Sequence, residues 1–476
     1  MPETSPPFLA DLAALLGPRG FTTDPDLLAP WLTDWRGRYT GRALGLASPA
    51  NAEEVAALVR LAAAHGIPLV PQGGNSGMSG GATPDASGTS LLVSLRRLST
   101  LGPVDTENRR ITCGAGVVLQ TLHTTAEASG LRFPLTLGGK GSATIGGLIA
   151  TNAGGTQVLR HGAMRAQVLG LEAVLPDGQI YSALTPLKKD NRGFDLKQLF
   201  IGSEGTLGII TAATLALAPG IVERRVVWAG VASIQAARTL LLHAEQALGE
   251  VLEAFEVVPH SAMEAVEAYS PTLRNPLGAP HAWYTLIEVV ADAAGADTLD
   301  ERVAIMLAEA FDDGLLADAA IARNETQAEA FWGIRETVPA AERAKGPAKQ
   351  HDIAVPVESM PDFITTASAT LEAAFPGCHT AAFGHLGDGN VHFHVIAPPG
   401  AERTAWEAGE GKAVTTMVHD LVTQWGGSIS AEHGIGQMKV DDLARLADPA
   451  ALSLLRAVKH ALDPAGLLNP GKLLAR

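Results

Sequence analysis

Residues that can do chemistry gather in two segments near the C-terminal end, AFGHLGDGNVHFHV (382–395) and AEHG (431–434). These segments supply His385, His392, His394, Glu432 and His433. If VHFHVIA forms a strand, His392 and His394 point to the same face, because side chains alternate along a strand, and the glycine-rich turn can fold His385 back towards them. Two imidazoles and one carboxylate suit Zn²⁺ or another divalent first-row ion. A metal-free, hydrogen-bonded cluster is the alternative.

Three glycine-rich segments indicate a second kind of site. They are PQGGNSGMSGG (71–81), LGGKGSATIGGLIATNAGG (137–155) and SEGTLG (203–208). Glycine lets the backbone approach a ligand closely and form anion-binding nests. One such loop is most simply a turn, but three of them favour one large phosphate-bearing cofactor. No G-x-G-x-x-G joins a strand to a helix, and GLLNPGKL (466–473) has Leu473 where a P-loop needs Ser or Thr. The sequence therefore supports neither a Rossmann site nor an ATP site.

The predicted helices and strands place these loops at the ends of elements. NAEEVAALVRLAAAHG (51–66) has the capping residues of an amphipathic helix, and IPLVPQGG follows as a strand that runs into the first glycine loop. A hairpin is expected at 168–182 around its PDG turn. We place a domain boundary at Pro219-Gly220. Residues 221–400 alternate long helical stretches with strands, which predicts an α+β domain before a helical tail.

Composition excludes several classes of protein. At 476 residues the chain suggests about three domains, and 46% hydrophobic with 18% charged residues predicts a large buried core. A net charge of -15 argues against nucleic-acid binding. The only cysteines are Cys113 and Cys378, so no disulfide scaffold is expected. Because the N-terminus lacks a signal-peptide pattern and no apolar run reaches about 18 residues, we expect a cytoplasmic protein, with peripheral membrane contact left open.

Taken together and in order, the motifs resemble those of a known family. They are PQGGNSGMSGG, LGGKGSATIGGLIATNAGG, FIGSEGTLGIIT, FWGIRE, HDIAVPV, GHLGDGNVHFHV, AEHGIG and LDPAGLLNPGK. This order is similar to that of the FAD-linked D-2-hydroxy acid dehydrogenases, which include D-lactate dehydrogenases, the glycolate oxidase flavin subunit and D-2-hydroxyglutarate dehydrogenase. They belong to the vanillyl-alcohol oxidase-type flavoprotein superfamily. The resemblance covers roughly residues 40–476.

The resemblance implies an α+β fold with four parts. An N-terminal helical segment (1–39) precedes a two-subdomain FAD-binding domain of the vanillyl-alcohol oxidase type (40–219). An α+β substrate domain (220–404) follows, and a helical C-terminal segment (405–476) returns to the FAD domain.

The resemblance also implies which residues contact FAD. The expected contacts are Pro71, Gly73, Gly74, Asn75, Ser76, Gly77, Met78, Pro134, Gly138, Gly141, Ser142, Thr144, Ile145, Gly146, Gly147, Asn152, Gly154, Glu204, Gly208, Ile209 and Asn469. Some relatives attach the flavin covalently through a His or Cys near the first loop. Asn75 stands there in this chain and cannot form that bond, so we expect non-covalent FAD.

The resemblance divides the histidines by role. It implies that His385, His392 and Glu432 bind a divalent metal, expected to be Zn²⁺. Metal coordination of the substrate hydroxyl would lower its pKa, and an imidazole is suited to taking that proton at neutral pH. His433, beside Glu432, is the candidate base, and Asp388 is expected to be a turn residue.

Arg335, His394 and Lys349 are the expected substrate contacts. Arg335 suits the substrate carboxylate, because a guanidinium binds a carboxylate bidentately; the alternative is a surface ion pair. Members of the family that act on dicarboxylates often have Lys where this chain has Gln350, with Lys349 displaced by one residue, and can have a hydroxyl side chain where it has Pro339. This departure favours a smaller acid such as D-lactate, with D-2-hydroxyglutarate kept open.

Two other functions compete with oxidation of a D-2-hydroxy acid to its 2-oxo acid. A flavin-free, metal-dependent hydrolase or hydratase would use the His/Glu site but leaves the glycine loops unexplained. A non-catalytic flavin subunit leaves the retained His, Glu and Arg residues unexplained. The sequence does not identify the electron acceptor among an electron-transfer flavoprotein, a quinone and a cytochrome, and it leaves a homodimer open.

Overall fold

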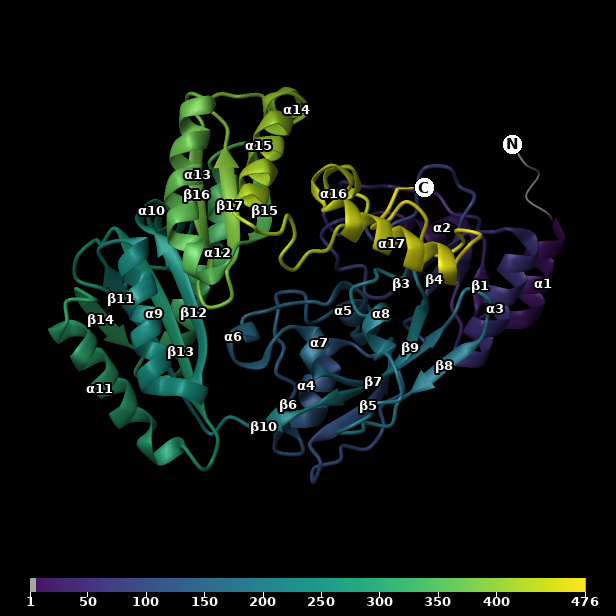
Figure 1. Ribbon diagram of the computed structural model, residues 1–476, viewed down its shortest axis with the longest axis horizontal. Helices are drawn as coiled ribbons and strands as arrows, with labels where there is room; N and C mark the ends of the chain where they lie inside the picture. Colours follow the sequence, from purple (N-terminus) through teal and green to yellow (C-terminus); the bar gives the residue numbers. More distant parts are fainter. Residues whose placement is uncertain (1–5, 476) are drawn as a thin grey trace. The chain divides into compact units, whose positions relative to one another are not determined.

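The computed structural model describes residues 6–475, and these form two compact units (Figure 1). The first unit contains the residues up to Gly155, His161–Gly220 and Glu432 onwards; the second contains Thr156–Arg160 and Ile221–Ala431. The unit boundary at Gly220 lies beside the boundary expected from the sequence. The helical tail expected at 405–476 is divided between the units. Parts of the expected segments 1–39 and 405–476, namely residues 1–5 and 476, lie outside the described residues.

The first unit begins with a small sheet in the order β1-β2-β4-β3, in which β2, β4 and β3 are parallel. Its elements are α1 (Pro6–Leu16), β1 (Phe21–Thr22), α2 (Pro25–Leu28), β2 (Leu46–Ala47), α3 (Ala52–His65), β3 (Leu69–Gln72) and β4 (Leu91–Ser94). The predicted helix at 51–66 is confirmed as α3. Asn51 Oδ1 accepts from the Glu54 amide at 2.8 Å, and Gly66 ends the helix in the left-handed conformation.

The second sheet of this unit is antiparallel, in the order β5-β9-β7-β8. This part of the unit contains β5 (Arg110–Gly114), α4 (Leu119–Glu127), β6 (Leu131–Arg132), α5 (Ile145–Thr151), α7 (Met164–Gln167), β7 (Val168–Val174), β8 (Ile180–Ala183), α8 (Lys197–Phe200), β9 (Ile209–Ala216) and β10 (Ala218–Pro219). The short helix α6 (Val158–His161) belongs to the second unit except for its last residue. The predicted hairpin is confirmed as β7 and β8. The chain returns to this unit with α16 (Val440–Leu446) and α17 (Pro449–Leu462).

The second unit is built on one antiparallel sheet in the order β14-β11-β13-β12-β16-β17-β15. The strands are β11 (Glu223–Val231), β12 (Leu252–Pro259), β13 (Trp283–Ala291), β14 (Asp318–Ile321), β15 (Ala348–Ala354), β16 (His379–His385) and β17 (Asn390–Ile396). The helices are α9 (Ile234–Leu248), α10 (His260–Tyr269), α11 (Leu299–Asp312), α12 (Glu325–Ala344), α13 (Met360–Ala374), α14 (Arg403–Ala408) and α15 (Glu410–Gln424). Short 3-10 helices occur in this unit at Gly249–Val251, Ala296–Thr298 and Val357–Ser359, and in the first unit at Ala29–Trp31.

Helices cover both faces of this sheet, and each face has its own core. Residues of α9, α11, α13 and α15 pack with Phe255, Val257 and Phe393 on one face. Residues of α10 and α12 pack with Trp228 and Phe383 on the other, which we call the α12 face. Burying both faces of the strands explains their nearly continuous hydrophobic sequences. The expected α+β fold is thereby confirmed.

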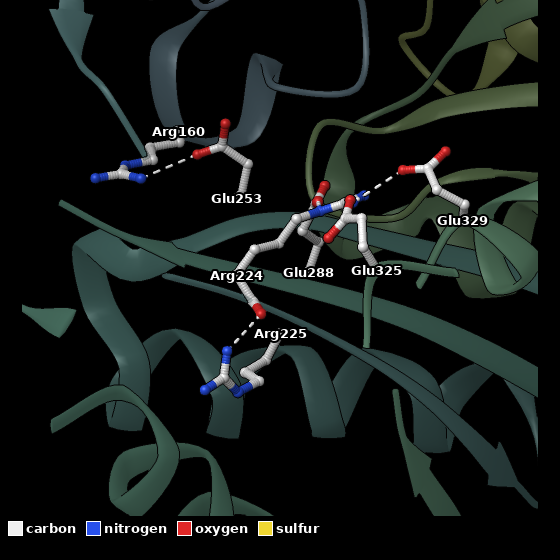
Figure 2. Close-up of polar contacts among 7 residues, drawn as sticks. All are labelled: Arg160, Arg224, Arg225, Glu253, Glu288, Glu325 and Glu329. Atoms are coloured by element: carbon white, nitrogen blue, oxygen red, sulfur yellow. Dashed lines mark hydrogen bonds and ion pairs between the residues drawn. The ribbon is translucent and has the colours of Figure 1, made fainter. Parts of the chain in front are cut away.

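Ion pairs fix α12 to the sheet beneath it. Arg224 on β11 pairs with Glu288 on β13 and with Glu325 and Glu329 on the first turns of α12 (Figure 2). Burial of the guanidinium works against its charge, but the surrounding carboxylates raise the pKa of Arg224 overall. Among residues 6–475, none of the helices combines the length and the apolar character that a membrane crossing needs.

Candidate functional site

The glycine loops enclose a cavity of about 640 Å³ within the first unit. The residues expected to contact FAD that line it are Pro71, Gly73, Gly74, Asn75, Ser76, Gly77, Met78, Gly138, Gly141, Ser142, Thr144, Gly146, Gly147, Gly154, Glu204, Gly208 and Ile209. Glu432 and His433 also line this cavity, although they were assigned from the sequence to metal binding and base catalysis. This volume lies within the usual range for small-molecule and cofactor sites.

Two glycines allow the first loop to lie against the second. A Cβ on Gly73 would lie 2.2 Å from the Thr144 Oγ1, and one on Gly74 would lie 1.9 Å from the Ser142 carbonyl oxygen. The obstacle at Gly74 is a backbone atom, so this approach of the loops requires glycine there; at Gly73 it is a side-chain hydroxyl, which would have to move to admit a Cβ. Next to them, Asn75 has φ +53°, and its Nδ2 donates to the Thr33 carbonyl at 2.8 Å.

The lining residues fit a cofactor that carries phosphates. The Thr144 Oγ1 is buried and has no hydrogen-bond partner among the described residues, so it can donate to a bound oxygen atom. A Cβ on Gly138 or Gly141 would meet no protein atom within 4 Å, so each glycine leaves open space where its side chain would be. Backbone amides of such glycines are well suited to the pyrophosphate of FAD.

Glu204 connects this cavity to the segment that carries His433. Its two carboxylate oxygens accept from the amides of Ile435 and Gly436, each at 2.7 Å. The Asn469 Nδ2 donates to the Glu204 carbonyl at 2.7 Å and to the Gly81 carbonyl at 2.9 Å. Burial raises the pKa of the Glu204 carboxyl, while the two amides act in the opposite direction. Asn469 therefore supports the cavity wall from behind and does not line it.

Glu432 lies directly over the second glycine loop. A Cβ on Gly154 would lie 2.5 Å from the Glu432 Oε1. Glycine at position 154 therefore makes room for the Glu432 carboxylate in the wall of the cavity. Because His433 is the next residue and also lines the cavity, both carry polar groups into the space expected to hold the flavin.

Four residues expected to contact FAD do not line the cavity: Pro134, Ile145, Asn152 and Asn469. Ile145 is fully buried in the hydrophobic core, as its aliphatic side chain favours. Asn152 has φ +50° and ends α5, and its Oδ1 accepts from the Arg165 amide at 2.9 Å. Trp35, which was not expected from the sequence, also lines the cavity, from a loop with no motif of its own.

In the second unit, the three histidines lie on β16 and β17, on the α12 face. The rings of His385 and His392 are 5.4 Å apart. Phe383 lies 5.3 Å from the ring of His392 and 4.9 Å from that of His394, so both rings are on one side of β17, as the alternation predicts. The two histidines expected to bind metal are thus brought together here, while Glu432 belongs to the first unit.

A buried carboxylate that the sequence analysis missed joins two of the expected site residues. Glu256 on β12 is fully buried, and its Oε1 bonds to the His385 Nδ1 at 2.5 Å. Its Oε2 accepts from the Arg335 Nε on α12 at 2.7 Å, and that guanidinium stacks 5.0 Å from the ring of Phe383. Burial opposes the charge, but His385 and Arg335 hold the pKa of Glu256 below its usual range. Arg335 is buried, so it does not form the surface ion pair that was its alternative.

Gln350 and Lys349, the two residues considered for contact with the substrate near His394, lie on opposite faces of the β-sheet. Gln350 is the cross-strand partner of His394, and its Nε2 donates to the Pro339 carbonyl on α12 at 3.4 Å. Lys349 points to the opposite face, where a Cβ on Gly411 of α15 would lie 2.7 Å from the Lys349 Cε. The structure therefore does not bring Lys349 together with Arg335 and His394, since consecutive strand residues alternate between faces.

Hydrogen bonds order the turn between β16 and β17. The Asp388 Oδ1 accepts from the Asn390 amide at 3.0 Å, which matches its expected role as a turn residue. The Asn390 Nδ2 donates to the Asp352 Oδ1 at 2.9 Å and to the Ile353 carbonyl at 3.0 Å. Burial raises the pKa of Asp388. The turn that brings His385 back beside His392 is thus fixed on both sides.

Comparisons with known proteins match both units. A family model of the FAD binding domain matches residues 43–183, and one for the C-terminal domain of FAD linked oxidases matches residues 222–473. The mitochondrial D-2-hydroxyglutarate dehydrogenase of Bos taurus is 36% identical, over 98% of this chain and 83% of that protein. The D-2-hydroxyglutarate dehydrogenase of Xanthomonas citri pv. viticola is 36% identical, over 95% of this chain and 93% of that protein.

Among solved structures, p-cresol methylhydroxylase with bound substrate superposes with a TM-score of 0.78 at 14% identity, covering 98% of this chain and 96% of that one. At this identity the likeness concerns the fold alone. Because one of the relatives is named mitochondrial, the cytoplasmic location stays a prediction.

Proposed function

The chain belongs to the FAD-linked oxidases and is an FAD-dependent oxidoreductase, and from this premise we propose that it oxidises a D-2-hydroxy acid to the 2-oxo acid. The observation that carries the proposal is the cavity of the first unit, whose wall contains both glycine loops and also Glu432 and His433. A proton-accepting imidazole in the wall of a cofactor cavity is what removal of a hydroxyl proton requires. A flavin-free hydrolase would leave the glycine loops without a role.

In this proposal FAD is bound without a covalent link by the glycine loops. When bound, FAD provides the hydride acceptor for the substrate α-carbon. His433 takes the hydroxyl proton at a ring nitrogen, and the amides bonded to Glu204 keep its loop in place. Arg335 binds the substrate carboxylate, and His394, beside the same Phe383 ring, contacts the substrate. We leave Lys349 out of the proposed site because of the face on which it lies.

We further propose that His385, His392 and Glu432 hold a divalent metal ion, with Zn²⁺ as the expected ion. The bond from Glu256 occupies the His385 Nδ1, so Nε2 is the nitrogen that this residue offers to a metal. A bound metal supplies Lewis-acid chemistry, which lowers the pKa of a coordinated hydroxyl. The donor set of two imidazoles and one carboxylate fits that ion.

D-2-hydroxyglutarate is the first candidate substrate. Gln350 and Pro339 favoured a smaller acid such as D-lactate on sequence grounds. The Bos taurus and Xanthomonas citri relatives, each 36% identical over nearly the whole chain, are named for D-2-hydroxyglutarate, which supports the dicarboxylate instead. In that case we propose that Gln350, the cross-strand partner of His394, contacts the far end of the substrate through its neutral amide.

Anaerobic bleaching of the flavin absorbance tests the proposal. Purified protein is mixed with the D and L forms of lactate and 2-hydroxyglutarate, with and without a chelator. We expect D-2-hydroxyglutarate to bleach the flavin, the L acids to fail, and chelation followed by Zn²⁺ to abolish and restore the reaction. A colourless protein, or no bleaching by either D acid, would contradict the proposal.

A substitution tests the base separately. His433→Ala should slow bleaching by roughly 10²–10⁴-fold while FAD stays bound, which is the usual contribution of a positioned base. His243→Ala is the matched control, because His243 lies on α9, on the face of the sheet away from Arg335, and bonds to the Met306 carbonyl. Equal rates for His433→Ala and the control would remove His433 from the mechanism.

A further inference from the structure

We propose that Glu256 is the positioning residue that fixes His385 and Arg335 together, so that metal binding and substrate binding depend on one buried carboxylate. The inference rests on the proposed function, in which His385 binds the metal and Arg335 binds the substrate carboxylate. Glu256 lies outside the family motifs. Its role follows from its place on β12.

The register of the sheet places the carboxylate between its two partners. Glu256 is the cross-strand partner of His385, and its side chain points to the α12 face, because Phe255 and Val257 on either side pack in the opposite core. Each oxygen serves one element: Oε1 bonds to the imidazole of β16, and Oε2 accepts from the guanidinium of α12. A shorter Asp at this position would lose one of these contacts.

The two bonds have different chemical consequences. Donation from the His385 Nδ1 to a carboxylate sets the tautomer that offers Nε2 to a metal and increases the basicity of the ring. The bond from the Arg335 Nε, together with stacking on Phe383, fixes the plane of the guanidinium. The four N–H donors on its two terminal nitrogens then have a defined direction for a carboxylate.

A purely structural ion pair would behave differently. Removing it would destabilise the second unit without changing the affinity of the folded protein for a metal. Glu253 provides the matched control, because it is also a buried glutamate at the start of β12, and it pairs with Arg160 at 3.0 Å (Figure 2). Glu253→Gln therefore tests the cost of losing a buried ion pair on the same strand.

The experiment measures Zn²⁺ affinity by competition with a chromogenic chelator for the FAD-loaded wild type, Glu256→Gln, Glu253→Gln and His385→Ala. We expect Glu256→Gln to bind Zn²⁺ roughly 10–100-fold more weakly, the usual effect of losing such an outer partner. Glu253→Gln should bind like wild type, and His385→Ala should lose the ion. The KM for the hydroxy acid should rise in Glu256→Gln and stay unchanged in Glu253→Gln, because only the former alters Arg335.

The outcomes separate this inference from the proposed function. If wild type and His385→Ala bind Zn²⁺ equally or not at all, the proposed metal site is wrong. If His385→Ala loses the ion while Glu256→Gln keeps wild-type affinity and KM, the positioning role of Glu256 is wrong and the site stands. If Glu256→Gln does not fold, Glu256→Asp replaces it, because it keeps the charge and gives up the reach to one partner; wild-type affinity and KM in that variant also overturn the inference.

Discussion

Gly74→Ala should separate the two glycine loops and thereby weaken FAD binding. The new Cβ would lie 1.9 Å from the Ser142 carbonyl oxygen, whereas a carbon–oxygen contact is comfortable at about 3.3 Å. The loops would therefore have to move apart by about 1.4 Å, since the obstacle is backbone and cannot rotate away. Overpacking of this kind costs roughly 1–3 kcal/mol. We expect the FAD-free protein to melt roughly 2–12 °C lower.

The same displacement alters the wall of the cavity, so FAD affinity measured by fluorescence titration should fall about 10–100-fold, equivalent to ~1.4–2.8 kcal/mol. Gly278→Ala is the matched control, because a Cβ there meets no atom within 4 Å and its φ is not positive. Gly141→Ala separates the two effects: it should keep the stability of the FAD-free protein, since no protein atom is near, and still bind FAD less tightly. Wild-type melting temperature and FAD affinity in Gly74→Ala would refute the steric reasoning.

Two further predictions address the proposed metal site and the position of α12. Gly154→Ala should displace the Glu432 carboxylate, because one of its oxygens lies 2.5 Å from the position of the new Cβ. Zn²⁺ affinity, measured by chelator competition, should therefore fall, but less than the complete loss expected for His385→Ala. Unchanged Zn²⁺ affinity would count against Glu432 as a ligand. Arg224→Ala should lower the free energy of unfolding in urea by ~3 kcal/mol, because it leaves Glu288 buried without this partner (Figure 2). Arg225→Ala should lower it by only ~0–1 kcal/mol, because the carboxylate partners of Arg225 are more exposed than Glu288. Equal losses for the two arginines would contradict this assignment.

Local patterns in the sequence predicted most of the fold. The capping residues of α3, the PDG hairpin of β7 and β8, and the alternation of His392 and His394 depend on neighbours within a few residues, and the structure contains all three. The glycine loops were recognised for the same reason. The number of these loops indicated one shared cofactor, but which of their residues line the cavity depends on contacts between segments about seventy residues apart.

The parts that the sequence did not reveal depend on pairing between distant strands. Glu256 lies in EAFEVV, which predicts only a strand, and its importance follows from a register that places it opposite His385, 129 residues later. Lys349 and Gln350 are adjacent in sequence, and the sequence does not tell which face of β15 each side chain takes; the pairing of β15 with β17 does. A buried acid within an apolar strand is the signal that could have directed attention to Glu256, since such a residue needs a partner.

Backbone conformation gives an independent reason to treat the cavity as functional. Six non-glycine residues among those described have positive φ, and four of them, Asn75, Asn152, Glu204 and Asn469, were expected at the cofactor site; the other two are Arg109 and Leu473. Asn tolerates this conformation, but Glu does not favour it, and a strained residue costs roughly 1–3 kcal/mol unless its surroundings hold it. Glu204 is held at every polar group: its amide donates to the Ala150 carbonyl, its carbonyl accepts from Asn469, and its carboxylate accepts two amides of the His433 loop. The strain at Glu204 is therefore maintained by contacts that join its own segment (203–208) to α5 and to the loop that carries His433. The proposed reaction needs a fixed geometry at that loop.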